Sequence, residues 1–211
     1  MSNGTKNVHV AVYDTLADWE VGHAIAHIAN GSFRAEPNEF AVVAVGATRE
    51  PVTTMGGLRV LPDIALDELD PADSAMLILP GAATWDAGGN SEFTEAARRF
   101  VEAGVPVAAI CGATFGLAAA GLLDDRDHTS SAAEYLAASG YKGGDRYVEA
   151  DAVNGGGVIT AGTTAQTGLA REIFAELGLY TPEVLDAWFR LFQHSDPSAF
   201  PVLMAASGAG R

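Results

Sequence analysis

Short apolar runs that alternate with helical spacing constrain the fold of this chain more than any other feature. Continuously apolar strands must be covered on both faces, and helical crossovers between them make a sheet mostly parallel. The runs are Val8–Tyr13, Phe40–Val45, Ala75–Leu79, Pro106–Ile110 and Val158–Ala161. Helical spacing occurs over Trp19–Asn30, Ser91–Ala103 and Ala113–Ala120, and from about Thr164, Thr181 and Asp196. The pattern predicts one α/β domain over residues 1–211, a doubly wound (flavodoxin-like) sheet with helices on both faces.

Turn residues predict where several of these elements begin and end. Asp18 is expected to cap the first helix, and Asn30-Gly31 to stop it. Gly56-Gly57 predicts a hairpin turn. Arg146–Glu149 is expected to form a further strand. Gly155–Gly157 is interpreted as another hairpin turn, because a phosphate-binding loop would continue into Lys-Ser/Thr.

The composition excludes some partners and indicates a compartment. The 211 residues carry a formal net charge of -15 with a pI near 4.5, which argues against nucleic-acid binding. A single cysteine allows no disulfide within the chain, as suits a reducing cytosol. The first apolar stretch is too short for a signal peptide, and no run reaches the roughly 18 residues of a membrane span. We therefore expect a cytoplasmic protein that does not bind membranes.

Three segments that follow predicted strands are candidate site elements. They are Asp14–Glu20, Pro80–Asp86 and Cys111–Thr114. In doubly wound folds, ligands bind beyond the carboxyl ends of the strands where the strand order reverses. We expect these segments to meet there and to bind a small-molecule substrate.

Cys111 stands where a strand passes at once into a helix, which is the layout of a nucleophile elbow. The positions two residues before and after it are Ala109 and Ala113, small enough for such a sharp turn. A helix N-terminus beside the sulfur is expected to lower the thiol pKa. The N–H of Gly112, with that of Gly81 or Ala82, could stabilise an oxyanion. A buried structural cysteine is the alternative.

The segments A-A-I-C-G-A-T, L-I-L-P-G-A and A-D-W-E-V resemble the PfpI/parkinsonism-associated deglycase superfamily, within the class I glutamine amidotransferase-like fold. The branch it looks like is bacterial and labelled amidotransferase-like or intracellular protease/amidase-like. The resemblance places Cys111 on the reactive cysteine and Glu20 on the carboxylate that meets the sulfur. It places Gly81 and Gly112 at the oxyanion hole and implies a homodimer. No cofactor and no metal are implied.

Three departures limit what the resemblance implies. Proteolytic members have a histidine directly after the cysteine, where this chain has Gly112. Deglycase-like members have a histidine in T-T-H, but here the segment reads D-H-T-S-S, so His128 comes about two positions early and Ser130 or Ser131 takes its place. The later H-x-E pair of a glutaminase triad is missing, because His194 lies in F-Q-H-S-D. These departures argue against peptidase and glutaminase activity.

Other candidates have two interpretations each. Glu20, His23 and His27 would share one helix face, either as zinc ligands or as side chains of a packed or dimer-facing helix. His128 is either a general base near Cys111 or a loop residue at a strand start. Trp85 and Asp86 either line the mouth of the site or, for Trp85, cap the core.

Two functions follow from these residues. In the first, Cys111 attacks a carbonyl carbon of a small substrate, in amide or thioester hydrolysis or in glyoxalase/deglycase-type chemistry, and Glu20 moves a proton. In the second, the protein is a non-catalytic oxidative-stress protein in which Cys111 senses peroxide and Glu20 holds the oxidised form.

Overall fold

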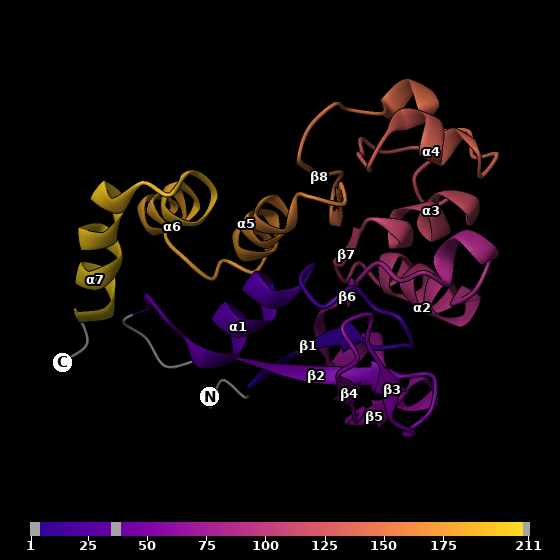
Figure 1. Cartoon of the computed structure of the whole chain (residues 1–211), viewed down its shortest axis with the longest axis horizontal. Coiled ribbons are helices and arrows are strands. Elements are labelled where there is room, and N and C mark those ends of the chain that lie inside the picture. The colour runs from indigo at the N-terminus through magenta and orange to yellow at the C-terminus, as the bar shows by residue number, and fades with distance from the viewer. Residues whose placement is uncertain (1–4, 35–38, 209–211) are drawn as a thin grey trace.

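A mostly parallel sheet forms the centre of the computed structural model, which describes residues 5–34 and 39–208 (Figure 1). In the described residues its strands lie in the order β5 (Ile64–Ala65), β2 (Phe40–Gly46), β1 (Lys6–Ala11), β6 (Ser74–Leu79), β7 (Val107–Ile110), β9 (Val158–Ala161) and β8 (Ala152–Asn154). Only the pairing of β8 with β9 is antiparallel among these neighbours. The predicted doubly wound sheet is confirmed.

The strand order reverses beside β1. The chain goes from β1 outward to β2, and later returns to place β6 and then β7 on the other side of β1. Because these strands are parallel, the segments that follow β1, β6 and β7 meet at the same edge of the sheet. The topology therefore brings the three candidate segments together.

Side chains of each central strand alternate between two apolar clusters, as the period of two residues in a β-strand requires. In β6, Met76 and Ile78 belong to one cluster, and Leu77 and Leu79 to the other. All four are fully buried. Such strands read as continuous apolar runs because neither face meets water.

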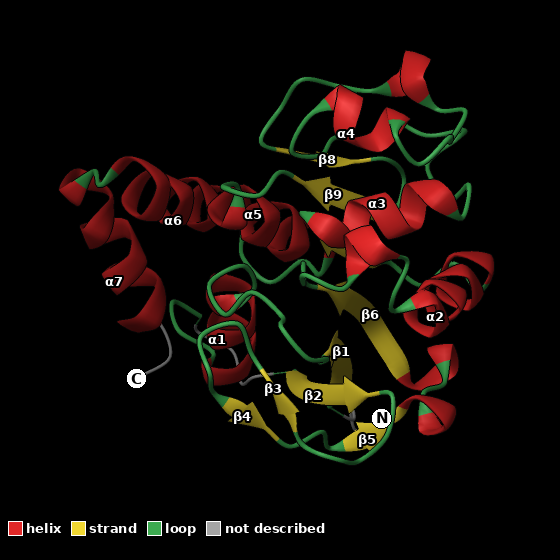
Figure 2. Cartoon of the chain, turned by 45° about the vertical axis from the view of Figure 1, so that its right-hand side comes forward, coloured by secondary structure: helices red, strands yellow, loops and turns green. Residues whose placement is uncertain are grey.

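Helices cover both clusters (Figure 2). The first lies under α1 (Gly22–Asn30), α5 (Gln166–Glu176), α6 (Pro182–His194) and α7 (Phe200–Gly208). The second lies under α2 (Ser91–Glu102) and α3 (Gly112–Ala119), with α4 (Ala133–Ala137) packed against α3. Figure 1 shows α7 at one end of the molecule, where it packs on α6.

Most predicted turns are confirmed and two local predictions are wrong. The hairpin of β3 (Val52–Thr53) and β4 (Arg59–Val60) encloses Gly56-Gly57, and Gly31 ends α1 in the left-handed conformation. The expected strand at Arg146–Glu149 does not form: Arg146 ends a 3-10 turn (Gly144–Arg146), and Tyr147 makes a single bridge to His128. Asp18 does not cap α1, because its carboxylate accepts the backbone N–H of Gly56 at 2.6 Å.

Candidate functional site

Cys111 occupies the sharp turn between β7 and α3. Its backbone has φ 56° and ψ -126°, a conformation that side chains rarely adopt and that costs about 1–3 kcal/mol. Backbone hydrogen bonds hold it on both sides: its N–H donates to Ala161 at 3.1 Å, and its carbonyl accepts the Thr114 N–H at 3.0 Å. Ala109 and Ala113, both fully buried, leave the turn enough room. The strand–turn–helix layout expected of an elbow is present.

The strain at position 111 can be measured without the thiol. We expect Cys111→Gly to have a free energy of unfolding about 1 kcal/mol higher than Cys111→Ala, because glycine adopts positive φ without a Cβ clash. At an ordinary position the order is reversed. Urea denaturation of the two variants measures the difference, and equal stability, or a more stable alanine variant, would show that the turn stores no strain.

Glu20 reaches the site from the turn before α1. The helix begins at Gly22 rather than at Trp19, so Glu20 is not part of the helix face predicted for it. Its side chain is 1% exposed, and its Oε2 accepts the Gly81 N–H at 2.6 Å. The same two segments are joined again where the Ala17 N–H donates to the Gly81 carbonyl at 2.9 Å. These two hydrogen bonds hold the segments after β1 and β6 together beside Cys111.

Gly81 lies against both Glu20 and Cys111 with no space to spare. A Cβ at this position would lie 2.8 Å from Glu20 Oε2 and 2.9 Å from Cys111 Cβ. Contacts below 3.0 Å require a shift of one partner, so only glycine fits beside both the carboxyl and the cysteine. Its N–H is used by Glu20, and this differs from the oxyanion-hole role expected for it.

The Glu20 carboxyl and the Cys111 thiol shift each other's pKa. Burial is the main cause that raises the pKa of Glu20 to about 7, and the hydrogen bonds from Gly81 and Cys111 oppose it. Burial also raises the pKa of Cys111, against the lowering hydrogen bonds from Thr163 and Gly112. The low thiol pKa expected from the helix N-terminus is therefore wrong in direction, since desolvation outweighs it.

When Glu20 is neutral, only one of its two carboxyl oxygens, Oε1, is available to carry the proton. Oε2 accepts from Gly81, whereas Oε1 is buried and meets no donor at full hydrogen-bond geometry among the described residues. A proton on Oε1 turns this atom into a donor. Glu20 can then donate to an anionic sulfur or to an oxygen bound to it.

Thr163 is a site residue that the sequence did not reveal. Its hydroxyl donates to Cys111 Sγ at 3.3 Å, and the Ser131 hydroxyl lies 2.5 Å from Thr163 Oγ1. Thr163 follows β9, which is the parallel neighbour of β7, and this pairing sets it beside Cys111. The only signal in the sequence was its place after an apolar strand.

An aromatic pair holds the Pro80 carbonyl just before Gly81. The Tyr13 hydroxyl and the Trp85 Nε1–H both donate to this oxygen, the latter at 3.1 Å. Trp85 is 1% exposed, so the core interpretation holds for it. Asp86 is exposed and accepts a hydrogen bond from the hydroxyl of Tyr135.

His128 is held in an aromatic cluster instead of against the thiol. Its Nδ1 donates to the Arg126 carbonyl at 2.8 Å, which leaves Nε2 to accept from the Tyr141 hydroxyl at 3.0 Å. The side chain is fully buried beside Tyr141 and Tyr147. Both ring nitrogens are thus engaged, and no hydrogen bond between His128 and Cys111 is found in residues 5–34 and 39–208.

The histidines of α1 pack against α6. Nε2 of His27 accepts from Trp188 Nε1 at 3.1 Å, and its Nδ1 lies 3.2 Å from the Tyr180 hydroxyl. The His23 ring contacts Trp188 and Phe192 edge-to-face. Within the described part of the chain, no group of three or more His, Cys, Asp or Glu could hold a metal ion. The contacts of His27 favour the packed-helix interpretation.

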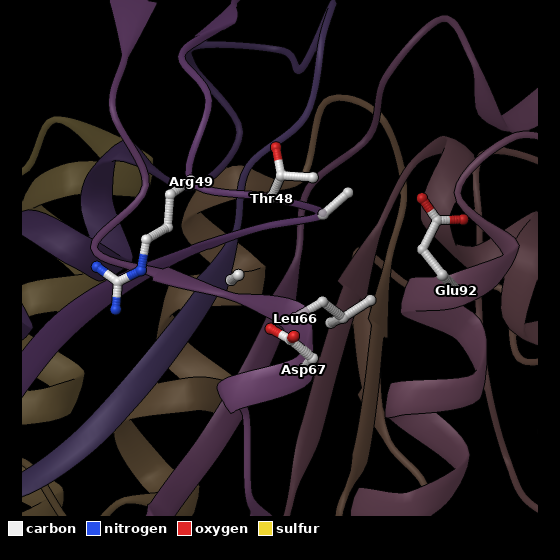
Figure 3. Close-up of a pocket in the computed structure, with 7 residues that line it drawn as sticks. Thr48, Arg49, Leu66, Asp67 and Glu92 are labelled. Carbon is white, nitrogen blue, oxygen red and sulfur yellow. The ribbon is translucent and has the colours of Figure 1, made fainter.

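A cavity of about 660 Å³ opens at the ends of β2 and β5. Figure 3 shows Glu92 facing Thr48, Leu66 and Asp67 across it. Arg49 at its rim is bound by both oxygens of Glu68, at 2.9 and 2.6 Å. Cys111 and Glu20 are not among the residues that line this cavity.

Comparisons with known proteins agree with the fold. The family model described as the DJ-1/PfpI family matches residues 6–176. The chain is similar to a protein of Bacillus subtilis (strain 168) named uncharacterized protease YoaZ, 36% identical over 203 residues, which cover 95% of this chain and 97% of that one. A second relative from that strain, uncharacterized protease YdeA, is 29% identical over 83% of this chain and 85% of its own.

Solved structures agree as well. A thiJ/pfpI family protein from Bacillus anthracis superimposes with a TM-score of 0.89 at 38% identity, covering 96% of this chain and 97% of its own. The DJ-1 superfamily protein Atu0886 from Agrobacterium tumefaciens gives a TM-score of 0.80 at 33% identity, covering 90% and 99%. No helix in the described residues is long and apolar enough to cross a membrane. On the family model and these relatives, the chain belongs to the DJ-1/PfpI family.

Proposed function

We propose that this protein is a cysteine-dependent enzyme that acts on a small carbonyl or amide substrate. Cys111 is the nucleophile, and Glu20 is the acid and base that serves it. The observation that carries the proposal is the pairing of a thiol on a strained turn with a buried carboxyl whose pKa is raised to about 7. A carboxyl with this pKa exchanges protons efficiently near neutral pH.

The first step uses only groups of this site. The Glu20 carboxylate takes the proton of the Cys111 thiol, the resulting thiolate attacks the carbonyl carbon and forms a C–S bond, and the π electron pair moves to the oxygen. That oxygen takes the proton from Oε1 of Glu20, which leaves a neutral adduct and a carboxylate. The Gly112 N–H, which bonds to the sulfur, stabilises the thiolate before the attack.

Two continuations are compatible with the same adduct. With an amide or ester, the adduct expels the amine or alcohol, which takes up a proton, and water then cleaves the thioester to an acid and the free thiol. With an α-oxoaldehyde, the Glu20 carboxylate removes the proton from the carbon that carries sulfur. This proton returns to the neighbouring carbon, and water cleaves the resulting 2-hydroxyacyl thioester.

Turnover of methylglyoxal and of p-nitrophenyl esters tests the proposal. We expect Cys111→Ser to abolish turnover and Glu20→Gln to lower it by about 10²–10⁴-fold, the usual contribution of a general acid or base. Glu92→Gln, an exposed carboxyl at the cavity that Cys111 and Glu20 do not line, is the matched control and should keep wild-type activity. Turnover that survives Cys111→Ser would refute the assignment of the nucleophile.

A peroxide-sensing function is the second candidate, because the protonated Oε1 can donate to an oxygen on sulfur. The thiolate and one peroxide give a sulfenic acid and hydroxide, and a second peroxide gives a sulfinic acid and water. Mass spectrometry after peroxide treatment distinguishes the two functions. Clean conversion of Cys111 to sulfinate, in a protein that turns over none of the substrates, would favour the sensor.

Proteolysis, which the relatives' names mention, has less support in this site. Gly112 follows the cysteine where the proteolytic pattern has histidine, and both nitrogens of His128 are engaged elsewhere. We further propose, from the resemblance alone, a cytoplasmic homodimer. Sedimentation velocity of the purified chain tests the dimer.

A further inference from the structure

Cys111 lies at the end of a short chain of hydroxyl groups. Thr163 donates to its Sγ at 3.3 Å, and Ser131 lies 2.5 Å from Thr163 Oγ1. A threonine hydroxyl has one proton, and Thr163 directs it to the sulfur. Ser131 must then donate the hydrogen bond between the two hydroxyls. Both hydroxyl donors, Ser131 and Thr163, therefore point toward Cys111.

The fold fixes this chain of hydroxyls from two sides. Ile110 of β7 is in register with Ala161 of β9, and the Cys111 N–H donates to the Ala161 carbonyl, which sets the segment after β9 beside the cysteine. At Gly162, a Cβ would lie 3.1 Å from the Ser130 carbonyl oxygen, so the segment that carries Ser131 packs directly on that of Thr163. Thr163 is half-buried and Ser131 is exposed.

The sulfur is thereby placed between two donors with different properties. Glu20 can donate only while it holds its proton, and above its pKa of about 7 it becomes an anion beside the sulfur. The hydroxyl of Thr163 cannot ionise in this range and donates at every working pH. A hydrogen bond donated to the thiolate stabilises this charged form of Cys111. In agreement with this, the Thr163 hydroxyl lowers the pKa of Cys111.

We propose that Thr163 and Ser131 are positioning residues for the Cys111 thiolate: Thr163 stabilises the anionic sulfur, and Ser131 fixes the direction in which Thr163 donates. The proposal rests on the role proposed above for Cys111 as the reacting atom. The sequence has Ser130 or Ser131 where deglycase-like members have their histidine, and Ser131 is the one that bonds to Thr163. Neither hydroxyl needs to contact the substrate.

The rate of alkylation by iodoacetamide against pH tests the proposal, because it reports the thiolate of Cys111, the only cysteine. Thr163→Val keeps the shape of the side chain and removes the donor. We expect it to raise the alkylation midpoint by about one pH unit, which means about tenfold less thiolate below the midpoint. Thr163→Ser restores the donor and should keep the wild-type midpoint. Ser131→Ala should shift the midpoint in the same direction by less.

Thr164→Val is the matched control, because Thr164 is the exposed neighbour of Thr163 and should leave the midpoint unchanged. Circular dichroism confirms that each variant is folded. Equal midpoints for Thr163→Val and Thr163→Ser, or a shift as large in Thr164→Val, would overturn the proposal. Alkylation does not depend on turnover, so the midpoint can be measured even if the protein has no enzymatic activity. A shifted midpoint in Thr163→Val without any turnover in wild type would refute the proposed enzymatic function but not the role of Thr163.

Discussion

Replacing Glu20 by glutamine is expected to raise the free energy of unfolding at pH 8 by about 3 kcal/mol and to change it little at pH 4.5. The cause is the buried carboxyl, whose pKa is about 7 in the folded protein and 4.5 as the ordinary value. Between these two pH values the folded state holds a proton that the unfolded chain has lost. Stability contributed by Glu20 is therefore fully present below pH 4.5 and falls as the pH rises to 7.

Glutamine avoids this loss because it never ionises. Its carbonyl oxygen can still accept the Gly81 N–H that Oε2 accepts, at 2.6 Å in the native protein. Urea denaturation of Glu20→Gln and wild type at half-unit steps from pH 4.5 to 8 measures the difference. A constant difference across this range would contradict a raised pKa, and Glu92→Gln shows the effect of an exposed carboxyl.

The second large effect concerns His27 and has the opposite sign. Burial, with smaller effects of the His23 and Arg34 charges, lowers the pKa of His27 from 6.5 to about 4. Between pH 6.5 and 4, His27 takes up a proton in the unfolded chain but stays neutral in the folded protein. Stability is thus lost as the pH falls from 6.5 to 4, and His27 alone accounts for about 3 kcal/mol of that loss.

The contacts of His27 explain why it stays neutral. Trp188 donates to Nε2, so protonation of this atom would break the bond that joins α1 to α6. On the other side, the Tyr180 hydroxyl donates to the Ser32 carbonyl at 3.0 Å and is left to accept from Nδ1 of His27. The rings of Phe33 and Phe174 also surround the imidazole and offer no carboxylate.

His27→Gln should abolish this acid dependence, whatever it does to stability at pH 7. The expected result is that the difference in unfolding free energy from wild type changes by about 3 kcal/mol between pH 6.5 and 4. His194→Gln, at an exposed histidine of the same helical layer, is the control. A difference that stays constant across this range would show that His27 titrates normally.

In wild type, the effects of Glu20 and His27 on the pH dependence of stability should largely cancel. From pH 4.5 to 6.5 Glu20 makes stability fall with rising pH and His27 makes it rise, each by about 1.4 kcal/mol per pH unit. His9 and His23, whose pKa values burial also lowers, add to the rise. A nearly flat stability curve in wild type is therefore compatible with two strongly shifted groups, and only the variants reveal them.

The sequence predicted the parts of this protein that local patterns determine. Apolar runs located β1, β2, β6, β7 and β9, and the direct passage from strand to helix located the turn of Cys111. β8 was missed, because three residues, Ala152–Asn154, form it only by pairing with β9. Its hairpin turn at Gly155–Gly157 was recognised, since glycine marks such turns without regard to the partner strand.

Contacts between distant segments explain what the sequence did not reveal. Helical spacing extended the first helix back to Trp19, but the bond of Glu20 to Gly81, 61 residues away, favours a turn before Gly22. Thr163 lies 52 residues from Cys111 and has no motif of its own. The helix N-terminus suggested a low thiol pKa, whereas burial, which no local pattern measures, sets the opposite direction.

The most direct test of this account is the titration of the Glu20 carboxyl by carbon-13 NMR. The side-chain carboxyls of glutamate are labelled, and the Glu20 resonance is assigned by its loss in Glu20→Gln. The account predicts a midpoint near pH 7 in wild type, because burial opposes ionisation beside Cys111. A midpoint near the ordinary 4.5 would contradict it, since a carboxylate ionised throughout the neutral range could not donate a proton to the sulfur or to its adducts.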